Sequence, residues 1–452
     1  MLSLFRLRLS FSHKADNTVS SFLHMLHMNP PPPITLFGEI LGSLAKKNHC
    51  FTVISLSRQM EFKGITPNMV TSTILINCFC HLGRINFAFS VLGNILKRGY
   101  HPNTITFTTL IKGMCHNGEI SKAMHFHDDM IAKGFQFNQV TYGVLINGLC
   151  KAGETKAALQ LLRRIEELAV QPNAVMYNTI IYSLCRDKLI TDAFDLYSEM
   201  GVKRISPSVV TYNALIHGFC VAGQLKNAVG LFNEMELKNN IKPDVHSYSI
   251  MINGFCKAKR VDEALALFDE MHHKKLIPNT VTYNSLLDGL FKAGRISYVW
   301  GLVHEMHDRG HSANIITYTS LLDGLCKNHH LDKAMVLFMK IKDRGIQPDI
   351  HTYTVIIDGL CKDGRLKNAQ EIFQVLMSEG YNLDVRTYTV MINGYCKEGL
   401  LDEAQALLSK MEDNSCTPNA VTFETIIHAL FEKNENDKAE RLLREMIARG
   451  LL

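Results

Sequence analysis

The sequence predicts an all-α fold, a right-handed superhelical α-solenoid of stacked helix-turn-helix repeats. Proline recurs at intervals of 35 residues, as from Pro67 to Pro102 and from Pro172 to Pro207. Each interval holds two apolar stripes with the spacing of a helix face. A chain of 452 residues is also too long for one ordinary compact core. Because a hairpin of ~35 residues cannot bury its stripes alone, neighbouring hairpins must stack.

The 35-residue period divides nearly the whole chain. A half repeat over residues 16–33, which contains a second helix only, precedes an array of twelve repeats over residues 34–452. The interval from Pro207 to Pro243 is 36 residues, so one repeat carries an extra residue near Asn239. The expected repeats span 34–68, 69–103, 104–138, 139–173, 174–208, 209–244, 245–279, 280–314, 315–349, 350–384, 385–419 and 420–452.

The first helix of a repeat is predicted from a stripe that is clearest in residues 139–173. Five apolar residues there fall at i, i+3, i+4, i+7 and i+8, namely Tyr142, Leu145, Ile146, Leu149 and Cys150. Gly153 follows, at a helix end where a positive φ is tolerated. The terminal proline, here Pro172, prevents simple continuation into the next helix.

A second stripe predicts the second helix, through Ala158, Leu161, Leu162 and Ile165. Asp262, Asp332 and Asp402 stand where an N-cap for this helix is expected. One alanine column allows the two helices to approach closely: Ala88, Ala123, Ala158, Ala193, Ala228, Ala264, Ala334, Ala369, Ala404 and Ala439. A methionine column is interpreted as core filler rather than as a binding groove: Met60, Met130, Met200, Met235, Met271, Met306, Met411 and Met446.

Cysteine follows the same period, from Cys80 through Cys115, Cys150, Cys185 and Cys220. No C-x-x-C pair occurs, and successive members belong to different repeats. A buried small apolar residue in a reducing compartment is therefore favoured over a zinc site or a disulfide.

The first 15 residues contain Arg6, Arg8 and Lys14 and no acidic residue. The basic residues interrupt the apolar run that a secretory signal would need, so residues 1–15 favour an organelle transit peptide. The formal net charge of +5 permits an acidic partner without indicating one. No apolar run reaches the ~20 residues of a membrane helix.

The recurring string VTYN-x-LI-x-GLCK-x-G resembles the pentatricopeptide repeat. It occurs at Val210 to Ile216 with Gly218 and Cys220, at Val140 to Lys151 and at Val281 to Leu287. A tetratricopeptide array would show a period of ~34 and a Trp-containing pattern, whereas this chain has one tryptophan, Trp300. The uniform repeat length resembles the P class. The string GLCKNHHLDKA and the acid-poor leader are similar to restorer-of-fertility-like members in plant organelles.

The resemblance implies that single-stranded RNA binds along the concave face, one base per repeat, in parallel orientation. The residue after the aromatic of the first helix reads the base together with the last residue of the repeat. The resemblance implies adenine for Thr73 with Asn103, Thr108 with Asn138, Ser249 with Asn279 and Thr389 with Asn419. It implies cytosine for Asn178 with Ser208, uracil for Asn213 with Asp244, and either pyrimidine for Asn284 with Asn314. It implies guanine for Thr319 with Asp349 and for Thr354 with Asp384.

The implied site is 5′-?-A-A-?-C-U-A-Y-G-G-A-3′, where Y is a pyrimidine. Gly38 and Gly143 offer no side chain to read with, and Glu424 lacks a partner. The residue two before the aromatic is implied to wedge against the base, with His246, His351 and Arg386 as departures from the apolar type. The apolar wedges are Val70, Ile105, Val175, Val210, Val281 and Ile316.

A basic column ends the first helices: Lys151, Arg186, Lys257, Lys292, Lys327, Lys362 and Lys397. Such residues are ordinary at helix C-termini, where the dipole favours them. Their position on the helix that carries the reading residues favours contact with phosphates.

The sequence offers no catalytic centre and no metal or cofactor site. His304, Glu305 and His307 approach a zinc-protease H-E-x-x-H motif, but Asp308 takes the place of its second histidine. We therefore expect an organelle RNA-binding protein without enzymatic activity that guides transcript processing, stabilisation or cleavage, with a separate nuclease or processing factor as partner. The expected compartment is the mitochondrion, with the plastid as alternative. A protein-binding scaffold is the competing interpretation, but it would not require Asn, Thr or Ser after the aromatic.

Overall fold

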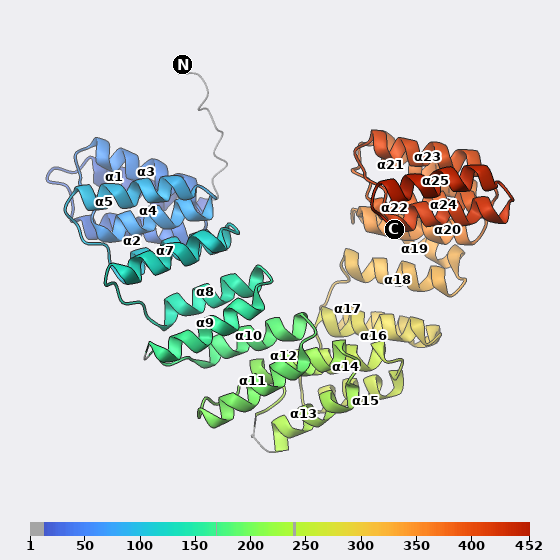
Figure 1. Cartoon of the computed structure of the whole chain (residues 1–452), viewed down its shortest axis with the longest axis horizontal. Coiled ribbons are helices and arrows are strands. Elements are labelled where there is room, and N and C mark those ends of the chain that lie inside the picture. The colour runs from blue at the N-terminus through green and yellow to red at the C-terminus, as the bar shows by residue number, and fades with distance from the viewer. Residues whose placement is uncertain (1–12, 169, 238–240) are drawn as a thin grey trace. The chain divides into compact units, whose positions relative to one another are not determined.

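The computed structural model describes residues 13–168, 170–237 and 241–452, and their regular secondary structure is α-helical throughout (Figure 1). The helices form consecutive hairpins, which confirms the predicted all-α solenoid. Contacts divide the chain into two compact units, Met1–Ala222 and Gly223–Leu452. Residues 1–12 of the predicted transit peptide lie outside the described residues, and residues 13–15 begin helix α1.

The first helices of the hairpins begin at the residues where the sequence period places the repeat starts. They are α2 (Ile34–Lys46), α4 (Met69–His81), α6 (Thr104–His116), α8 (Gln139–Lys151), α10 (Ala174–Arg186), α12 (Val209–Val221), α14 (Val245–Lys257), α16 (Thr280–Lys292), α18 (Ile315–Lys327), α20 (Ile350–Lys362), α22 (Val385–Lys397) and α24 (Ala420–Glu432).

The second helices follow after a short turn. Helix α1 (His13–Leu26) stands alone before α2, and the others are α3 (Cys50–Phe62), α5 (Ile85–Lys97), α7 (Ile120–Ala132), α9 (Thr155–Glu167), α11 (Ile190–Val202), α13 (Leu225–Leu237), α15 (Val261–His273), α17 (Ile296–Asp308), α19 (Leu331–Asp343), α21 (Leu366–Ser378), α23 (Leu401–Asp413) and α25 (Asn436–Ala448).

Most first helices begin on an Asn or Asp side chain. The Oδ1 atom of Asn103 accepts a hydrogen bond of 3.0 Å from the Thr106 amide, and that of Asp349 accepts one of 2.8 Å from the Thr352 amide. These bonds satisfy amides that have no partner within the helix. The same cap recurs at Asn68, Asn138, Asn173, Asp244, Asn279, Asn314, Asp384 and Asn419.

The second helices begin differently from the prediction. Asp262, Asp332 and Asp402 are not N-caps, because each helix starts one residue earlier and places the aspartate in its first turn. There the carboxylate is favoured by the helix dipole. Each carboxylate also forms an ion pair with a basic side chain of the next repeat: Asp262 with Arg295 at 2.6 Å, Asp332 with Arg365 at 2.8 Å and Asp402 with Lys438 at 2.9 Å.

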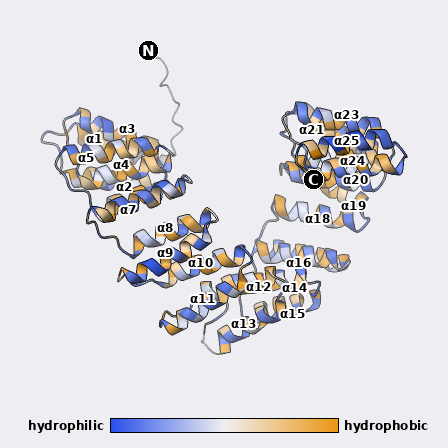
Figure 2. Ribbon diagram, in the orientation of Figure 1, coloured by the Kyte–Doolittle hydropathy of each residue, from blue (hydrophilic) through white to orange (hydrophobic). Residues whose placement is uncertain are grey.

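The core of each unit includes both predicted columns of small and flexible side chains. Every alanine of the alanine column is fully buried, and every methionine of the methionine column is buried. Tyrosines of the first helices, such as Tyr177 and Tyr283, are also completely buried. Hydrophobic and hydrophilic positions alternate along the helices, as the coloured ribbon shows (Figure 2).

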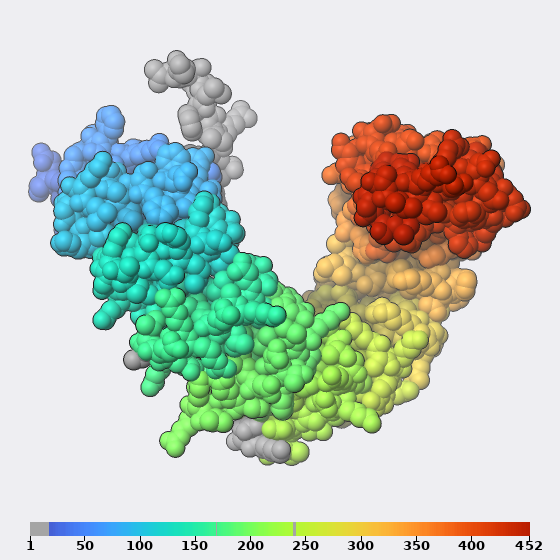
Figure 3. Space-filling view, in the orientation of Figure 1, coloured from blue at the N-terminus to red at the C-terminus, as the bar shows by residue number. Residues whose placement is uncertain are grey.

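Successive hairpins are held at close range by a glycine in the first helix. A Cβ atom built on Gly359 would lie 2.6 Å from the Sγ atom of Cys326 in the preceding repeat. Asn328 adds a second link, since its amide donates to the Phe291 carbonyl at 3.1 Å and to the Gly324 carbonyl at 2.8 Å. Within each unit the hairpins accordingly pack as successive layers (Figure 3).

Candidate nucleic-acid interface

A row of apolar side chains is exposed at the second residue of the first helices. These residues are 55–68% exposed, although Val and Ile usually lie in the interior. The row consists of Val70, Ile105, Val140, Val175 and Val210 in the first unit and of Val281, Ile316 and Val421 in the second. It contains all six predicted wedges. A regular row of this kind is typical of a binding surface, and scattered exposed apolar residues would not repeat with the period.

Each expected base-reading pair has two members. The inner member is the residue after the aromatic of the first helix, and the outer member is the last residue of the repeat. The outer member ends the repeat and is the N-cap of the next first helix, so Asp349, Asp384 and Asn419 are exposed. The inner member lies deeper: Ser249, Thr319 and Thr354 are buried, and Thr73 is half-buried. The outer side chains therefore present most of the polar surface of each pair.

In the second unit, a buried threonine joins the inner and outer members. The Oγ1 atom of Thr352 lies 2.7 Å from that of Thr319 and donates a bond of 2.7 Å to the Oδ1 atom of Asp349. Thr387 joins Thr354 to Asp384 with the same distances. The two remaining bridges are Thr282 between Ser249 and Asn279, and Thr422 between Thr389 and Asn419.

The first unit repeats this arrangement. Thr106 lies 3.1 Å from Thr73 and 3.1 Å from Asn103, measured between side-chain oxygens. Thr141 joins Thr108 to Asn138 at 2.7 and 3.4 Å. Thr211 donates to the Oδ1 atom of Asn178 at 2.7 Å and lies 3.4 Å from the Oγ atom of Ser208.

Two expected reading pairs stand apart from those just described. Asn213 belongs to the first unit and Asp244 to the second. Asn284 has a buried Oδ1 atom without a hydrogen-bond partner among the described residues, and its proposed partner Asn314 caps α18. Such an atom is costly unless a ligand donates to it.

The two glycines at reading positions differ in their surroundings. An added Cβ on Gly143 would meet nothing within 4 Å, whereas one on Gly38 would lie 3.6 Å from Thr71 and 3.9 Å from Val70. Beside Gly38 the surface is also hollowed between Thr35, Gly42 and Val70.

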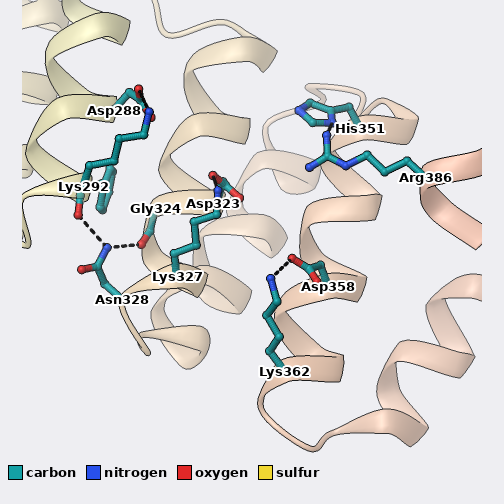
Figure 4. Close-up of polar contacts among 11 residues, drawn as sticks. Asp288, Lys292, Asp323, Gly324, Lys327, Asn328, His351, Asp358, Lys362 and Arg386 are labelled. Carbon is teal, nitrogen blue, oxygen red and sulfur yellow. Dashed lines mark hydrogen bonds and ion pairs between the residues drawn. The ribbon is translucent and has the colours of Figure 1, made fainter. Parts of the chain in front are cut away.

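The basic column shares a face with the wedges. Val281 and Lys292 are eleven residues apart on α16. Eleven residues are about three helical turns plus 20°, so the two side chains leave the helix in nearly the same direction. Three of the lysines are not free cations: Lys292 pairs with Asp288, Lys327 with Asp323 and Lys362 with Asp358, each at 2.6 Å (Figure 4). Each of these helices is therefore locally neutral at its C-terminal end.

The other four members have different surroundings. Arg186 donates to the Cys150 carbonyl at 2.7 Å and pairs with Asp187 at 3.2 Å. Lys151, Lys257 and Lys397 have no ion pair within the part of the chain that the structure describes. Asparagine precedes each of the three by four residues, where aspartate precedes the paired lysines.

Two of the non-apolar wedges meet each other. The Nη1 atom of Arg386 lies 3.4 Å from the Nδ1 atom of His351 in the preceding repeat (Figure 4). Both side chains are exposed. Neighbouring wedge positions therefore face one continuous surface in this unit.

Metal and membrane sites were also sought among residues 13–168, 170–237 and 241–452. No group of three or more His, Cys, Asp or Glu side chains there could hold a metal ion. No helix in those ranges combines the length and the apolarity that a bilayer span requires.

The fold and this interface define a helical-repeat solenoid with a periodic polar and apolar binding face. The PPR repeat family model matches residues 73–116, 102–151, 172–221, 207–257, 251–292, 278–327, 314–362, 352–397 and 383–432. The single PPR repeat model matches residues 140–170 and 421–451. The chain belongs to the PPR repeat family.

Known proteins resemble parts or all of the chain. A mitochondrial pentatricopeptide repeat-containing protein of Arabidopsis thaliana is 40% identical over 87 residues, which are 19% of this chain and 14% of that protein. A second one is 39% identical over 90 residues, 20% of this chain and 18% of that protein. The crystal structure of PPR10 from maize matches 97% of this chain and 67% of its own, with a TM-score of 0.69 and 25% identity.

The hydrogen bonds made by the bridging threonines could not be predicted from the sequence. The signal of these threonines is present in the recurring string, where Thr precedes the aromatic in most repeats. Periodicity alone assigns that position to the buried face of the helix. It does not reveal a bond to a side chain 33 residues earlier in the chain.

Proposed function

We propose that this protein binds single-stranded RNA sequence-selectively, with one base at each repeat. The observation that carries this proposal is the row of exposed apolar wedges beside the polar inner and outer pairs, repeated on successive first helices. An apolar side chain stacks on any base, while amide, hydroxyl and carboxylate groups distinguish hydrogen-bonding edges. The eighteen residues of the inner and outer pairs are the proposed readers, and the seven basic residues the proposed phosphate contacts.

The cap geometry supplies a physical reason for the outer residue's preference. The helix start occupies one oxygen of the outer side chain, so Asn turns its NH₂ group outward and Asp turns its second oxygen outward. Adenine and cytosine carry a ring acceptor on the Watson–Crick edge, whereas guanine and uracil carry a ring N–H. Outer Asn therefore suits adenine or cytosine, and outer Asp suits guanine or uracil. The assignments for Asp349, Asp384 and Asn419 follow this rule.

We further propose a P-class, restorer-of-fertility-like protein acting in plant mitochondria, with the plastid as alternative. Support comes from the mitochondrial relatives. The matched segments cover 14% and 18% of the length of those two proteins. Occupying an RNA segment would protect it, or direct a separate nuclease to an adjacent position. The transit peptide over residues 1–15, the half repeat 16–33 and the twelve-repeat array 34–452 belong to this proposal.

Asp349→Asn tests the proposed function at one base. The variant keeps the cap, because Asn caps a helix about as well as Asp. It replaces an outward acceptor by an outward donor, so the preference at the ninth base should change from guanine to adenine. The expected discrimination is ~1–3 kcal/mol, by analogy with a mismatched base pair in a protein–DNA site.

Binding to RNAs that differ only at the ninth base measures this change. Asn419→Asp is the reciprocal variant, and it should change the eleventh base from adenine to guanine. Guanine preference that survives Asp349→Asn would show that Asp349 only caps α20.

A further inference from the structure

We propose that the buried threonine found third in most first helices is a positioning residue for base selection in the preceding repeat. This inference rests on the proposed function and identifies residues that set its specificity without touching RNA. Its members with side-chain bonds to an inner hydroxyl are Thr106, Thr141, Thr282, Thr352, Thr387 and Thr422.

Burial excludes direct reading by these threonines. Thr106, Thr352 and Thr387 have no exposed surface, so a base cannot reach their hydroxyl groups. The bridging hydroxyl instead contacts both side chains that are proposed to meet the base. A rotation of either reading residue must break a bond to the bridge.

Proton counting shows what the bridge fixes. Thr319 and Thr352 have two hydroxyl protons, and their oxygens make three short contacts, to the Ile315 carbonyl, to each other and to Asp349. An ionised carboxylate has no proton to give, so the Thr352 proton goes to Asp349. The Thr319 proton then goes to Thr352 or to the Ile315 carbonyl. In both arrangements the proton of Thr319 is used inside the protein, and its remaining lone pairs are left for a base.

One repeat lacks both the inner hydroxyl and the bridging threonine. The repeat 139–173 has Gly143 at the inner position and so has no hydroxyl to join. The bridging position that follows is Met176 instead of threonine, and Asn173 still caps α10 through its bond to the Met176 amide at 3.1 Å. Capping therefore does not require the threonine hydroxyl.

Thr352→Val tests the inference, because valine keeps the shape and the capping amide and removes only the hydroxyl. Thr352→Ser restores the hydroxyl. Thr71→Val is the control: the Thr71 hydroxyl also donates to the Asn68 side chain, but the inner residue of that repeat is Gly38. Fluorescence anisotropy would give the affinity of each protein for the implied site with guanine or adenine at the ninth base, and melting would report the fold.

The parent protein should favour guanine by about tenfold. Thr352→Val should reduce that ratio to about twofold, while Thr352→Ser and Thr71→Val should keep it near tenfold. A parent that shows no preference at the ninth base would overturn the proposed function and this inference with it. A parent that prefers guanine, with the preference intact in Thr352→Val, would overturn the bridge alone. A loss of preference in Thr71→Val as well would reduce the hydroxyl to a general role in stability.

Discussion

At the scale of single residues, one side chain caps a helix and is also a proposed base reader. Asp349 ends one repeat, starts the next helix with one oxygen and presents the other to solvent. Capping a helix and reading a base look like alternative roles for one carboxylate. The geometry makes them compatible, because a carboxylate has two oxygens and the cap uses one.

The reactivity of the cysteine thiols tests the burial of single residues. Burial raises the pKa of the Cys185, Cys256 and Cys361 thiols to about 12, so thiolate is scarce at neutral pH. These three should react slowly with iodoacetamide at pH 8, and the less buried Cys416 should react first. Mass spectrometry of the labelled native and urea-unfolded protein measures the order. Rapid native labelling of Cys256 would contradict its place in the core.

At the scale of helices and hairpins, much of the fold could be predicted from the sequence. Two stripes per 35 residues define a hairpin, and the recurrence of alanine, as at Ala369 and Ala404, indicates where helices meet. Details at helix ends were less predictable, because the start of a helix is uncertain by a residue or two from sequence. Asp262 was assigned as a cap for that reason. The bridge at Thr352 and the pairing of Lys327 with Asp323 depend on side-chain geometry, which periodicity does not contain.

The close approach of hairpins predicts opposite changes in stability for two glycine-to-alanine substitutions. Gly359→Ala would press a methyl group onto Cys326 and Leu331 and should cost ~1–3 kcal/mol. Gly301→Ala, in α17 where nothing lies within 4 Å, should instead stabilise its helix by ~0.5–1 kcal/mol. Because solenoid coupling is mainly between neighbours, the loss should concentrate in α18 to α21.

Hydrogen exchange of the two variants separates these effects. Faster exchange in the 315–349 and 350–384 repeats of Gly359→Ala is expected. Uniform loss of protection along the whole chain would contradict nearest-neighbour coupling, and equal effects of the two substitutions would contradict the close contact.

The lysine and aspartate pairs predict how salt acts on binding. If all seven basic residues contacted phosphate, the slope of log K against log salt would be about −5, at ~0.7 per contact. Neutral pairs release few counterions, so Lys151, Lys257 and Lys397 alone would give a slope of about −2. Asp323→Asn frees Lys327 and should tighten binding and steepen the slope by ~0.7. Asn147→Ala, beside unpaired Lys151, is the control and should leave the slope unchanged. A slope that Asp323→Asn does not alter would remove Lys327 from the phosphate contacts.

At the scale of the whole molecule, specificity should be a sum over repeats. Each first helix carries one exposed wedge position and one proposed reading position. The fold class followed from the period alone, and the order of base preferences followed from the family resemblance. The sequence could not supply the division into two compact units, Met1–Ala222 and Gly223–Leu452, because it depends on contacts between helices.

Selection from a pool of random single-stranded RNA tests the central claim of sequence-selective binding most directly. The protein should enrich adenine at positions two, three, seven and eleven, cytosine at five, uracil at six and guanine at nine and ten. Position eight should accept either pyrimidine, and positions one and four should be the least selective because Gly38 and Gly143 offer no inner side chain. The same sequence in a duplex should bind poorly, since its bases are stacked and paired. A bound pool without base preference, or equal affinity for the duplex, would contradict recognition of RNA bases by these repeats.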